Sequence, residues 1–411
     1  MQTISIYITS FIIFLLLLGR KSFALINIQG VYFIEIGILI IALTFLPKYL
    51  IAVLKRKACF INKSFVNARR SVLFLICFVI YNAILILLSP GFDPQNIIPG
   101  IYPFYFLLFF IIALNCKIES LERSIKWILL FFCVSPLLAF LYVPLFESLF
   151  EPYFSPGNTY VYAVALLIGI FVLEISIVSI VLILGTIIFA FVLGERATFL
   201  NIVVGASIII LFSNKSSSKV YLFKRLVPAL GLFMMIFFAL PFINDFILNL
   251  FSEMRFDFTH QNIINFFKSI LSSAPDLVGA GTRFHRLEMW SNIVGEWLSS
   301  PSTFFFGTGY VGNVALEIFR NPHNGFLTLI KRGGLINIVL YASFIIYLIR
   351  AIKETHGDKK TMAFGLASLG AFLGDAATGT IIDSPYTSCI FYAQIALILA
   401  YLERKTIVKN S

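Results

Sequence analysis

Residues 160–192 read YVYAVALLIGIFVLEISIVSIVLILGTIIFAFV, a run of 33 residues in which Glu174 is the only charge. About 20 helical residues cross a hydrocarbon core of about 30 Å, so this run is too long for one crossing. The sequence therefore predicts two spanning helices joined by a tight turn near Glu174. A single very long helix is the alternative.

Apolar segments of this kind recur along the whole chain of 411 residues, which is 59% hydrophobic and 12% charged. Soluble domains carry about 25% charged residues. Transmembrane β-barrels are excluded because their strands alternate in polarity over about ten residues. We expect an all-α integral membrane protein with about 12 transmembrane helices. They fall approximately at residues 3–18, 30–46, 71–88, 98–114, 125–146, 160–173, 175–192, 197–213, 226–248, 325–349, 361–380 and 385–402.

Basic residues gather in alternate loops between these helices. Most of the 31 lysines and arginines lie in loops 47–70, 115–126, 214–225 and 350–360 and in the tail after residue 402. By the positive-inside rule these loops and both termini are cytoplasmic. Topology thus accounts for most of the net charge of +11, and no nucleic-acid partner is expected.

One long polar interval, residues 249–321, interrupts the apolar pattern and ends in Asn321-Pro322-His323-Asn324. It contains two of the three tryptophans. We divide the chain into transmembrane helices (1–248), a large external loop (249–324), and the last transmembrane helices with a cytoplasmic tail (325–411).

Within the external loop, residues 282–299 predict a helix. Arg286, Trp290, Ile293 and Trp297 follow helical spacing and share one face. Pro301 ends this helix, and three phenylalanines lead into a glycine turn. The turn Gly307–Gly312 matches G-x-G-x-x-G, but no βαβ unit surrounds it, so we interpret it as a return toward the membrane.

Eight basic residues lie on the outer side, where the positive-inside rule does not require them. A basic outer surface suits an anionic substrate such as a phosphate. Six acids in the loop offer partners for several of these cations: Glu253, Asp257, Asp276, Glu288, Glu296 and Glu317. The eight cations are Arg196, Arg255, Lys268, Arg283, Arg286, Arg320, Lys331 and Arg332.

Three of these positions suggest chemistry. Arg196 lies at the mouth of an apolar helix, where a guanidinium is costly unless it faces a cavity or a partner, and its fork fits phosphate oxygens. Arg283 and Arg286 lie one turn apart and can clamp a diphosphate. The structural alternatives are pairing of Arg196 with Glu195 or a lipid headgroup, and ion pairs within the loop.

His323 precedes an apolar helix and is suited to act as a general base toward a sugar hydroxyl at neutral pH. An interfacial histidine with a hydrogen-bonded partner is the alternative. Glu35 and Glu174 are acids within or between spans, and Asp375 and Asp383 flank the last outer turn, so a transporter stays open. The five cysteines show no metal spacing, and neither zinc nor disulfides are expected.

The order of these elements resembles the O-antigen polymerases and O-antigen ligases, over roughly residues 190–345. That family has a Ser-Arg-like pair at a helix mouth, then R-x-x-x-W, P-x-x-x-F-G-x-G and H-N before a helix with G-x-x-G. The corresponding segments here are Glu195-Arg196, Arg286–Trp290, Pro301–Gly309 and His323-Asn324. Glutamate replaces the small residue before Arg196. Gly333-Gly334 followed by Asn337 departs from the G-x-x-G of the ligases.

The resemblance implies a metal-independent, inverting glycosyltransferase with the C-type membrane fold, in the bacterial inner (plasma) membrane with its active site on the outer side. Its substrates would be undecaprenyl-diphosphate-linked glycans, with no cofactor and with a chain-length regulator as a possible partner. It implies catalytic roles for His323, Arg196 and Arg286. We expect Arg283, Arg320, Asn324 and Trp290 to bind substrate, although Trp290 also suits an interfacial anchor. A polymerase is the leading interpretation, a ligase the second and a flippase the third.

Overall fold

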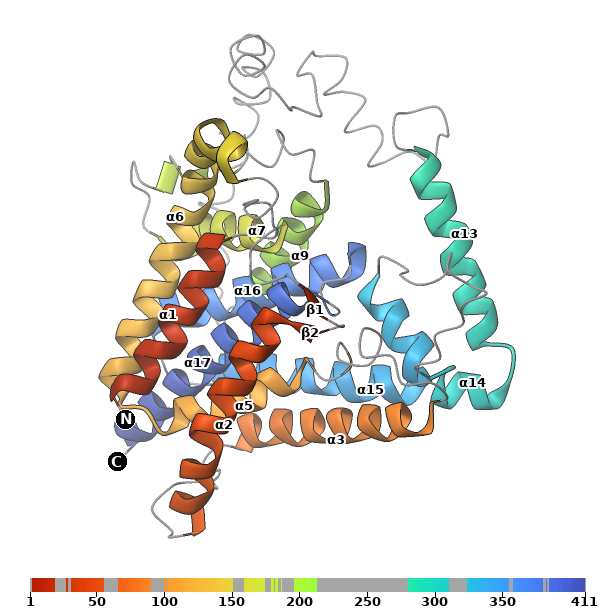
Figure 1. Ribbon diagram of the computed structural model, residues 1–411, viewed down its shortest axis with the longest axis horizontal. Helices are drawn as coiled ribbons and strands as arrows, with labels where there is room; N and C mark the ends of the chain where they lie inside the picture. The colour runs from red at the N-terminus through yellow and green to blue at the C-terminus, as the bar shows by residue number, and fades with distance from the viewer. Residues whose placement is uncertain are drawn as a thin grey trace.

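A computed structural model describes residues 2–18, 27–28, 31–54, 66–89, 100, 102–150, 159–173, 179–180, 182–183, 186, 196–212, 280–309, 324–354, 358–379, 382 and 384–410. In these ranges the protein is helical, apart from two short antiparallel strands, β1 (Asn27–Ile28) and β2 (Val31–Tyr32). Figure 1 shows the helices gathered into a bundle, with one helical arm at its edge.

The described helices coincide with most of the expected spans, while the span expected at residues 226–248 lies outside the described residues. Three helical stretches are long and apolar enough to cross a membrane: Ala68–Leu88, Gly325–Glu354 and Pro385–Thr406. This is the architecture of an α-helical membrane protein. The bundle helices are α1 (Gln2–Leu18), α2 (Phe33–Leu54), α3 (Val66–Leu88), α5 (Phe104–Leu114), α6 (Ile118–Phe150), α7 (Thr159–Leu167), α9 (Arg196–Phe212), α15 (Gly325–Glu354), α16 (Lys359–Thr378) and α17 (Pro385–Asn410).

The long apolar run that begins at residue 160 does turn back on itself. Helix α7 continues as a π-helix, η3 (Ile168–Val172), and Leu173 is extended. A Cβ atom at Gly169 would lie 2.9 Å from Ile183. In one straight helix, residues 169 and 183 would be about 21 Å apart along the axis. The close contact therefore excludes the alternative of one very long helix, while Glu174, where the sequence predicts a tight turn, lies outside the described residues.

Helix α17 lies at the centre of the bundle. Its whole apolar span is buried, with α5, α6, α16 and α1 packed around it. Because every face of this span is covered, it is mostly apolar all round, and the charged residues of α17 come after residue 402. Phe391 stacks on Phe372 of α16 with ring centroids 3.8 Å apart, and Tyr160 of α7 packs edge-on against both rings.

Small residues bring α9 and α16 into close contact. A Cβ atom at Gly374 would lie 2.5 Å from the Cα atom of Asn201, and one at Gly370 would overlap Gly205. Neither glycine of α16 accepts a larger side chain unless the helices separate. Close backbone approach through small residues is a common way for helices to associate in membranes.

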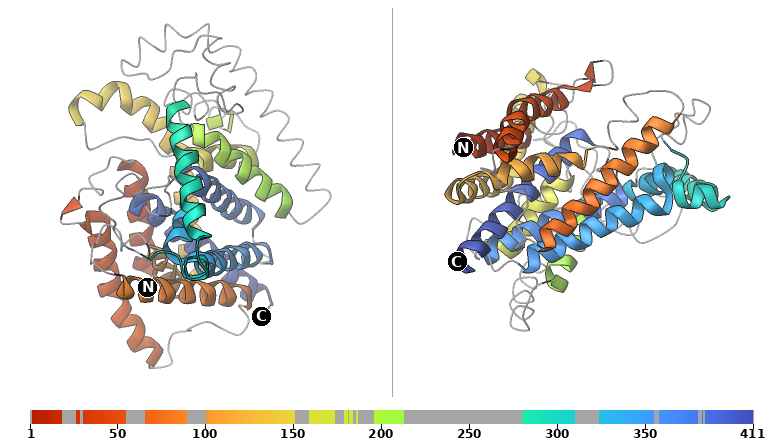
Figure 2. Two further views of the ribbon diagram at one scale, coloured as in Figure 1. Left: turned by 90° about the vertical axis from the view of Figure 1, so that its right-hand side faces the viewer. Right: turned by 90° about the horizontal axis from the view of Figure 1, so that it is seen from below.

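Two helices form the arm, α13 (Ala280–Trp297) and α14 (Pro301–Phe306). Both pack on α15, and Figure 2 shows α13 along one side of the bundle. The predicted helix at residues 282–299 is thus present. Among its described side chains Met289 and Ile293 are buried, while Ser291 and Asn292 are exposed, so the face that carries Ile293 packs.

Candidate functional site

Helix ends from four parts of the chain meet at one end of the bundle. The hydroxyl of Thr159, the first residue of α7, donates to Oδ1 of Asp375 in α16 at 2.9 Å. Asn324, just before α15, donates through Nδ2 to the carbonyl of Ala377 at 2.8 Å. Asn201 of α9 lies against Gly374. We call Thr159, Thr198, Asn201, Asn324 and Asp375 the α16-end cluster.

The side chain of Asn324 forms hydrogen bonds to both α15 and α16. Its Oδ1 accepts the backbone N–H of Leu327 at 3.1 Å and so caps the start of α15, as asparagine commonly does. The same amide donates to α16. Gly325 follows, and a Cβ atom there would lie 2.7 Å from Ile382. A capping residue followed by glycine therefore fixes the start of α15 next to the end of α16.

Asp375 supplies a carboxylate to the cluster although it is only 8% exposed. Its backbone carbonyl accepts the N–H of Gly379 at 2.7 Å, which closes the last turn of α16. In the sequence Asp375 is notable only as a residue beside an outer turn. Its hydrogen bond to Thr159 joins residues 216 positions apart, and no local pattern signals such a contact.

Two side chains of α9 have buried polar atoms with no partner among the described residues. The Thr198 hydroxyl and both polar atoms of the Asn201 amide form no hydrogen bond with any described residue. Such groups each cost about 1–3 kcal/mol, so natural proteins keep few of them without a functional reason. Both residues follow Arg196, the first residue of α9.

Helix ends of both signs meet here, because α16 ends with its partial negative charge beside the Asp375 carboxylate while three other helices begin. Helices α7, α9 and α15 all begin here, and the free N–H groups of a helix N-terminus carry partial positive charge. Arg196 is the first residue of α9. Positive helix ends beside polar groups that have no described partner can bind phosphate oxygens, and Asp375 can accept a proton or a hydrogen bond nearby.

The turn after α14 attaches the arm to α15. Gly307 and Gly309 have φ values of 69° and 77°, which suit glycine. The N–H groups of Thr308 and Gly309 donate to the carbonyls of Lys331 and Arg332 at 2.7 and 3.1 Å. The glycine motif therefore forms a turn after a helix and docks on a membrane helix, which agrees with our interpretation and not with dinucleotide binding.

Helix α15 bends where this turn docks. Gly334 has φ 61° and ψ −154°, and Figure 1 shows the two parts of α15 running in different directions. Asn337 bridges the bend: its Nδ2 donates to the Leu329 carbonyl at 3.1 Å, and its Oδ1 accepts from Asn82 of α3 at 2.8 Å. Tyr81 of α3 donates to the carbonyl of Gly333 at 2.9 Å. The departure from G-x-x-G at Asn337 thus has a structural role.

A shallow hollow lies between the arm and α15, lined by Ile293, Glu296, Trp297, Thr303, Gly307, Thr308, Ile330 and Lys331. Phe304 covers one face of the Trp297 ring, so that face is not available to a sugar. Its ring stacks on Phe304 with centroids 5.0 Å apart, and its Nε1 donates to the Phe304 carbonyl. This tryptophan therefore stabilises the junction of α13 and α14.

The structure places some of the predicted site residues and not others. Asn324 belongs to the α16-end cluster, and the backbone of Arg196 begins the helix that carries Thr198 and Asn201. Trp290 lies half-buried on α13, whose backbone also carries Arg283 and Arg286. His323 and Arg320 lie outside the described residues.

The acid Glu35, a candidate for a proton relay, has local partners. Its carboxylate accepts the backbone N–H of Tyr32 at 3.0 Å and the hydroxyl of Tyr102 at 2.8 Å. Glu35 lies in the first turn of α2, so it satisfies a free N–H at a helix start. The other such acid, Glu174, lies outside the described residues. Among the residues described, no group of three or more His, Cys, Asp or Glu side chains is placed to bind a metal ion.

Comparison with known proteins gives no relative: no family model matches this chain, and no curated protein matches it.

Proposed function

We propose that this protein is a membrane glycosyltransferase that polymerises undecaprenyl-diphosphate-linked oligosaccharide repeat units into a surface polysaccharide. One observation carries the proposal. Residues far apart in the sequence, Asn324 next to His323 and the start of α9 at Arg196, both lie at the end of α16. These are two of the positions at which the chain resembles the polymerase and ligase family.

The proposal includes a topology. The chain crosses the inner membrane about 12 times, with both termini cytoplasmic and residues 249–324 on the outer side, in a fold of the C-type membrane glycosyltransferases. The α16-end cluster then faces outward. A lipid-linked donor reaches it from the outer leaflet, with its diphosphate at the level of the membrane surface.

The reaction follows from the charges at this end. Arg196 and the helix N-termini bind the diphosphate of the donor, and Arg283 or Arg286 completes the clamp from α13. His323 takes the proton of the acceptor hydroxyl, whose oxygen attacks the anomeric carbon from the opposite side. The bond from that carbon to the diphosphate oxygen breaks, the configuration inverts, and the lipid diphosphate leaves with the electron pair. Positively charged groups and N–H groups that neutralise the negative charge growing on the diphosphate lower the activation barrier most.

Other residues of the site bind and orient. Asn324 fixes the backbone beside His323, and Arg320 and Trp290 contact the glycan. We assign Asp375 the orientation of the acceptor hydroxyl, because its carboxylate lies at the same end as Asn324. The donor is already activated as a diphosphate, so the residues present suffice for the chemistry without a nucleotide.

The test is deletion of the gene in its host, with surface glycans separated on a gel. Wild type should restore a ladder of long chains, while His323→Ala and Arg196→Ala should leave core with a single repeat unit. Arg123→Ala, in α6 on the opposite side of the proposed topology, is the matched control and should restore the ladder. Protein level in the membrane is measured for every variant.

Three other outcomes contradict the proposal. Polymer of normal length that accumulates on the lipid carrier identifies a ligase instead. Loss of even the single repeat unit from the surface identifies a flippase. A wild-type ladder from both His323→Ala and Arg196→Ala removes these residues from the reaction.

A further inference from the structure

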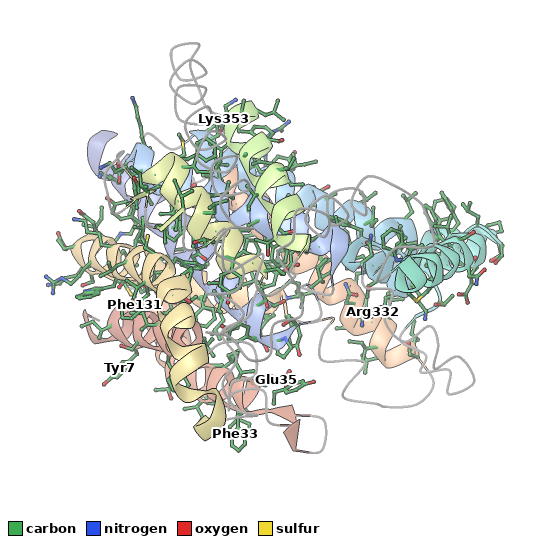
Figure 3. The ribbon with its side chains drawn as sticks, turned by 90° about the horizontal axis from the view of Figure 1, so that it is seen from above. Tyr7, Phe33, Glu35, Phe131, Arg332 and Lys353 are labelled. Atoms are coloured by element: carbon green, nitrogen blue, oxygen red, sulfur yellow. The ribbon has the colours of Figure 1, made fainter. Side chains whose placement is uncertain are left out.

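A second group of cations lies where α3 begins and α15 ends, away from the α16-end cluster. The Cζ atoms of Arg70 and Arg350 lie 5.6 and 5.4 Å from the centre of one ring, that of Tyr347. Phe74 stacks on the same ring with centroids 5.3 Å apart. Figure 3 shows Lys353 at this end of α15, far from Arg332. Two helices thus bring two guanidinium groups to one tyrosine.

These two guanidinium groups have no carboxylate partner in the described part of the chain. The single ion pair found there joins Lys126 and Glu122 on α6. Glu354 lies one turn beyond Arg350 and forms no ion pair with it, and Glu403 of α17 accepts the backbone N–H of Ala68. Two like charges near one ring repel each other, and an anion bound between them removes that repulsion.

The surface beside these arginines is apolar. Leu73, one turn after Arg70, is 56% exposed, and Ile346, one turn before Arg350, is 49% exposed. Both belong to helices long and apolar enough to cross a bilayer. Tyrosine is enriched at the level of lipid headgroups, where its hydroxyl meets water and its ring meets acyl chains. The surface around Arg70 and Arg350 can therefore hold a phosphate group and acyl chains side by side.

We propose that Arg70 and Arg350 bind the phosphate of an anionic phospholipid headgroup, with the acyl chains along Leu73 and Ile346. The guanidinium fork matches two phosphate oxygens, and Tyr347 holds both arginines through cation–π contacts. Lys353, whose Nζ lies 6.0 Å from the ring of Phe212, adds positive charge at the same end. The exposed apolar flank favours a lipid over free phosphate as the source of the anion. This inference does not rest on glycosyl transfer.

The experiment measures lipid binding to the purified full-length protein by native mass spectrometry. Phosphatidylglycerol and phosphatidylcholine are titrated separately against wild type and against the double variant Arg70→Gln, Arg350→Gln. Wild type should retain phosphatidylglycerol preferentially, and the double variant should bind it at least about tenfold more weakly. Arg69→Gln and Arg123→Gln together form the control, because they remove the same charge from exposed positions that do not contact Tyr347.

Each outcome decides the proposal. Equal loss of binding in the control pair shows general attraction to positive charge and overturns the site. Unchanged binding of phosphatidylglycerol by the double variant also overturns the site. Inorganic phosphate is the third arm: if it displaces phosphatidylglycerol at equal concentration, the site binds free anion and the lipid assignment fails. Melting curves of the detergent-solubilised variants, matched to wild type, exclude misfolding as the cause.

Discussion

Replacement of Gly334 by alanine should separate the arm from α15. At φ 61° and ψ −154° a residue with a Cβ atom is strained by about 1–3 kcal/mol. The added Cβ would also lie 2.5 Å from the carbonyl carbon and oxygen of Phe305 and 2.6 Å from the nitrogen of Gly307. Carbon contacts normally lie at about 3.5–4.0 Å, so α14 must move by roughly 1 Å.

That movement lengthens two hydrogen bonds, from the N–H groups of Thr308 and Gly309 to α15. Each contributes about 0.5–1.5 kcal/mol, so Gly334→Ala should cost about 2–6 kcal/mol in total. Gly295→Ala is the matched control. Gly295 is exposed within α13, and a Cβ atom there meets nothing within 4 Å. Alanine should therefore stabilise that helix by about 0.5–1 kcal/mol.

The assay combines thermal unfolding in detergent with limited proteolysis. Gly334→Ala should melt at lower temperature than wild type and should be cleaved faster between α14 and α15, while Gly295→Ala should melt at or above the wild-type temperature. Equal melting temperatures and equal cleavage rates for the two variants would refute the docking of the turn on the bend in α15.

Three further predictions test the polar contacts. Asn337→Ala removes two buried hydrogen bonds, one to the Leu329 carbonyl and one from the Asn82 amide, which keeps its bond to the Phe78 carbonyl, so it should destabilise the protein by about 1–3 kcal/mol. Addition of Asn82→Ala should cost less than the sum of both changes, and additive costs in melting curves would contradict the contact. Thr198→Val removes a buried hydroxyl that has no partner among the described residues, so the free energy of unfolding should rise by about 1 kcal/mol. The amount of long glycan should decrease, and an unchanged amount would make Thr198 structural only. Asp375→Asn keeps an acceptor for the Thr159 hydroxyl, so the melting temperature should stay at the wild-type value. The rate of polymerisation should fall roughly a hundredfold, and a wild-type rate would remove Asp375 from the site.

The sequence was sufficient to predict the local features of this fold. Apolar runs predicted most of the helices, because a spanning helix must be long and apolar wherever it lies in the chain. The length of the run that begins at residue 160 predicted that this run is not one straight helix. Helical spacing predicted that Trp290, Ile293 and Trp297 share one face of α13. Each of these signals lies within one continuous segment.

Features that depend on two distant segments could not be predicted in this way. The bend at Gly334 exists because a turn from the arm occupies the space that a straight helix would fill. Asn337 departs from a family motif in the sequence, yet it bonds to Asn82, 255 positions away. Asp375 and Thr159 are separated by 216 positions. Glu35 is a case in which the sequence suggests more than the structure shows. An acid in an apolar segment suggests proton transfer, yet Glu35 accepts a backbone N–H at the start of its own helix.

Helix α15 connects three sites: the α16-end cluster, the docked turn of the arm, and the arginines beside Tyr347. Residues 325–333 continue from Asn324 in the α16-end cluster, whereas the part after Gly334 packs along α3 and ends beside Tyr347. At the bend, the carbonyls of Lys331 and Arg332 bond to the turn after α14, while Asn337 and Tyr81 tie the same segment to Leu329 and to α3. Asn324 is held at the other end of this segment by its hydrogen bonds to Ala377 and Leu327. The segment from Asn324 to Gly334 is therefore fixed at both ends, by α16 at its start and by the arm and α3 at its bend.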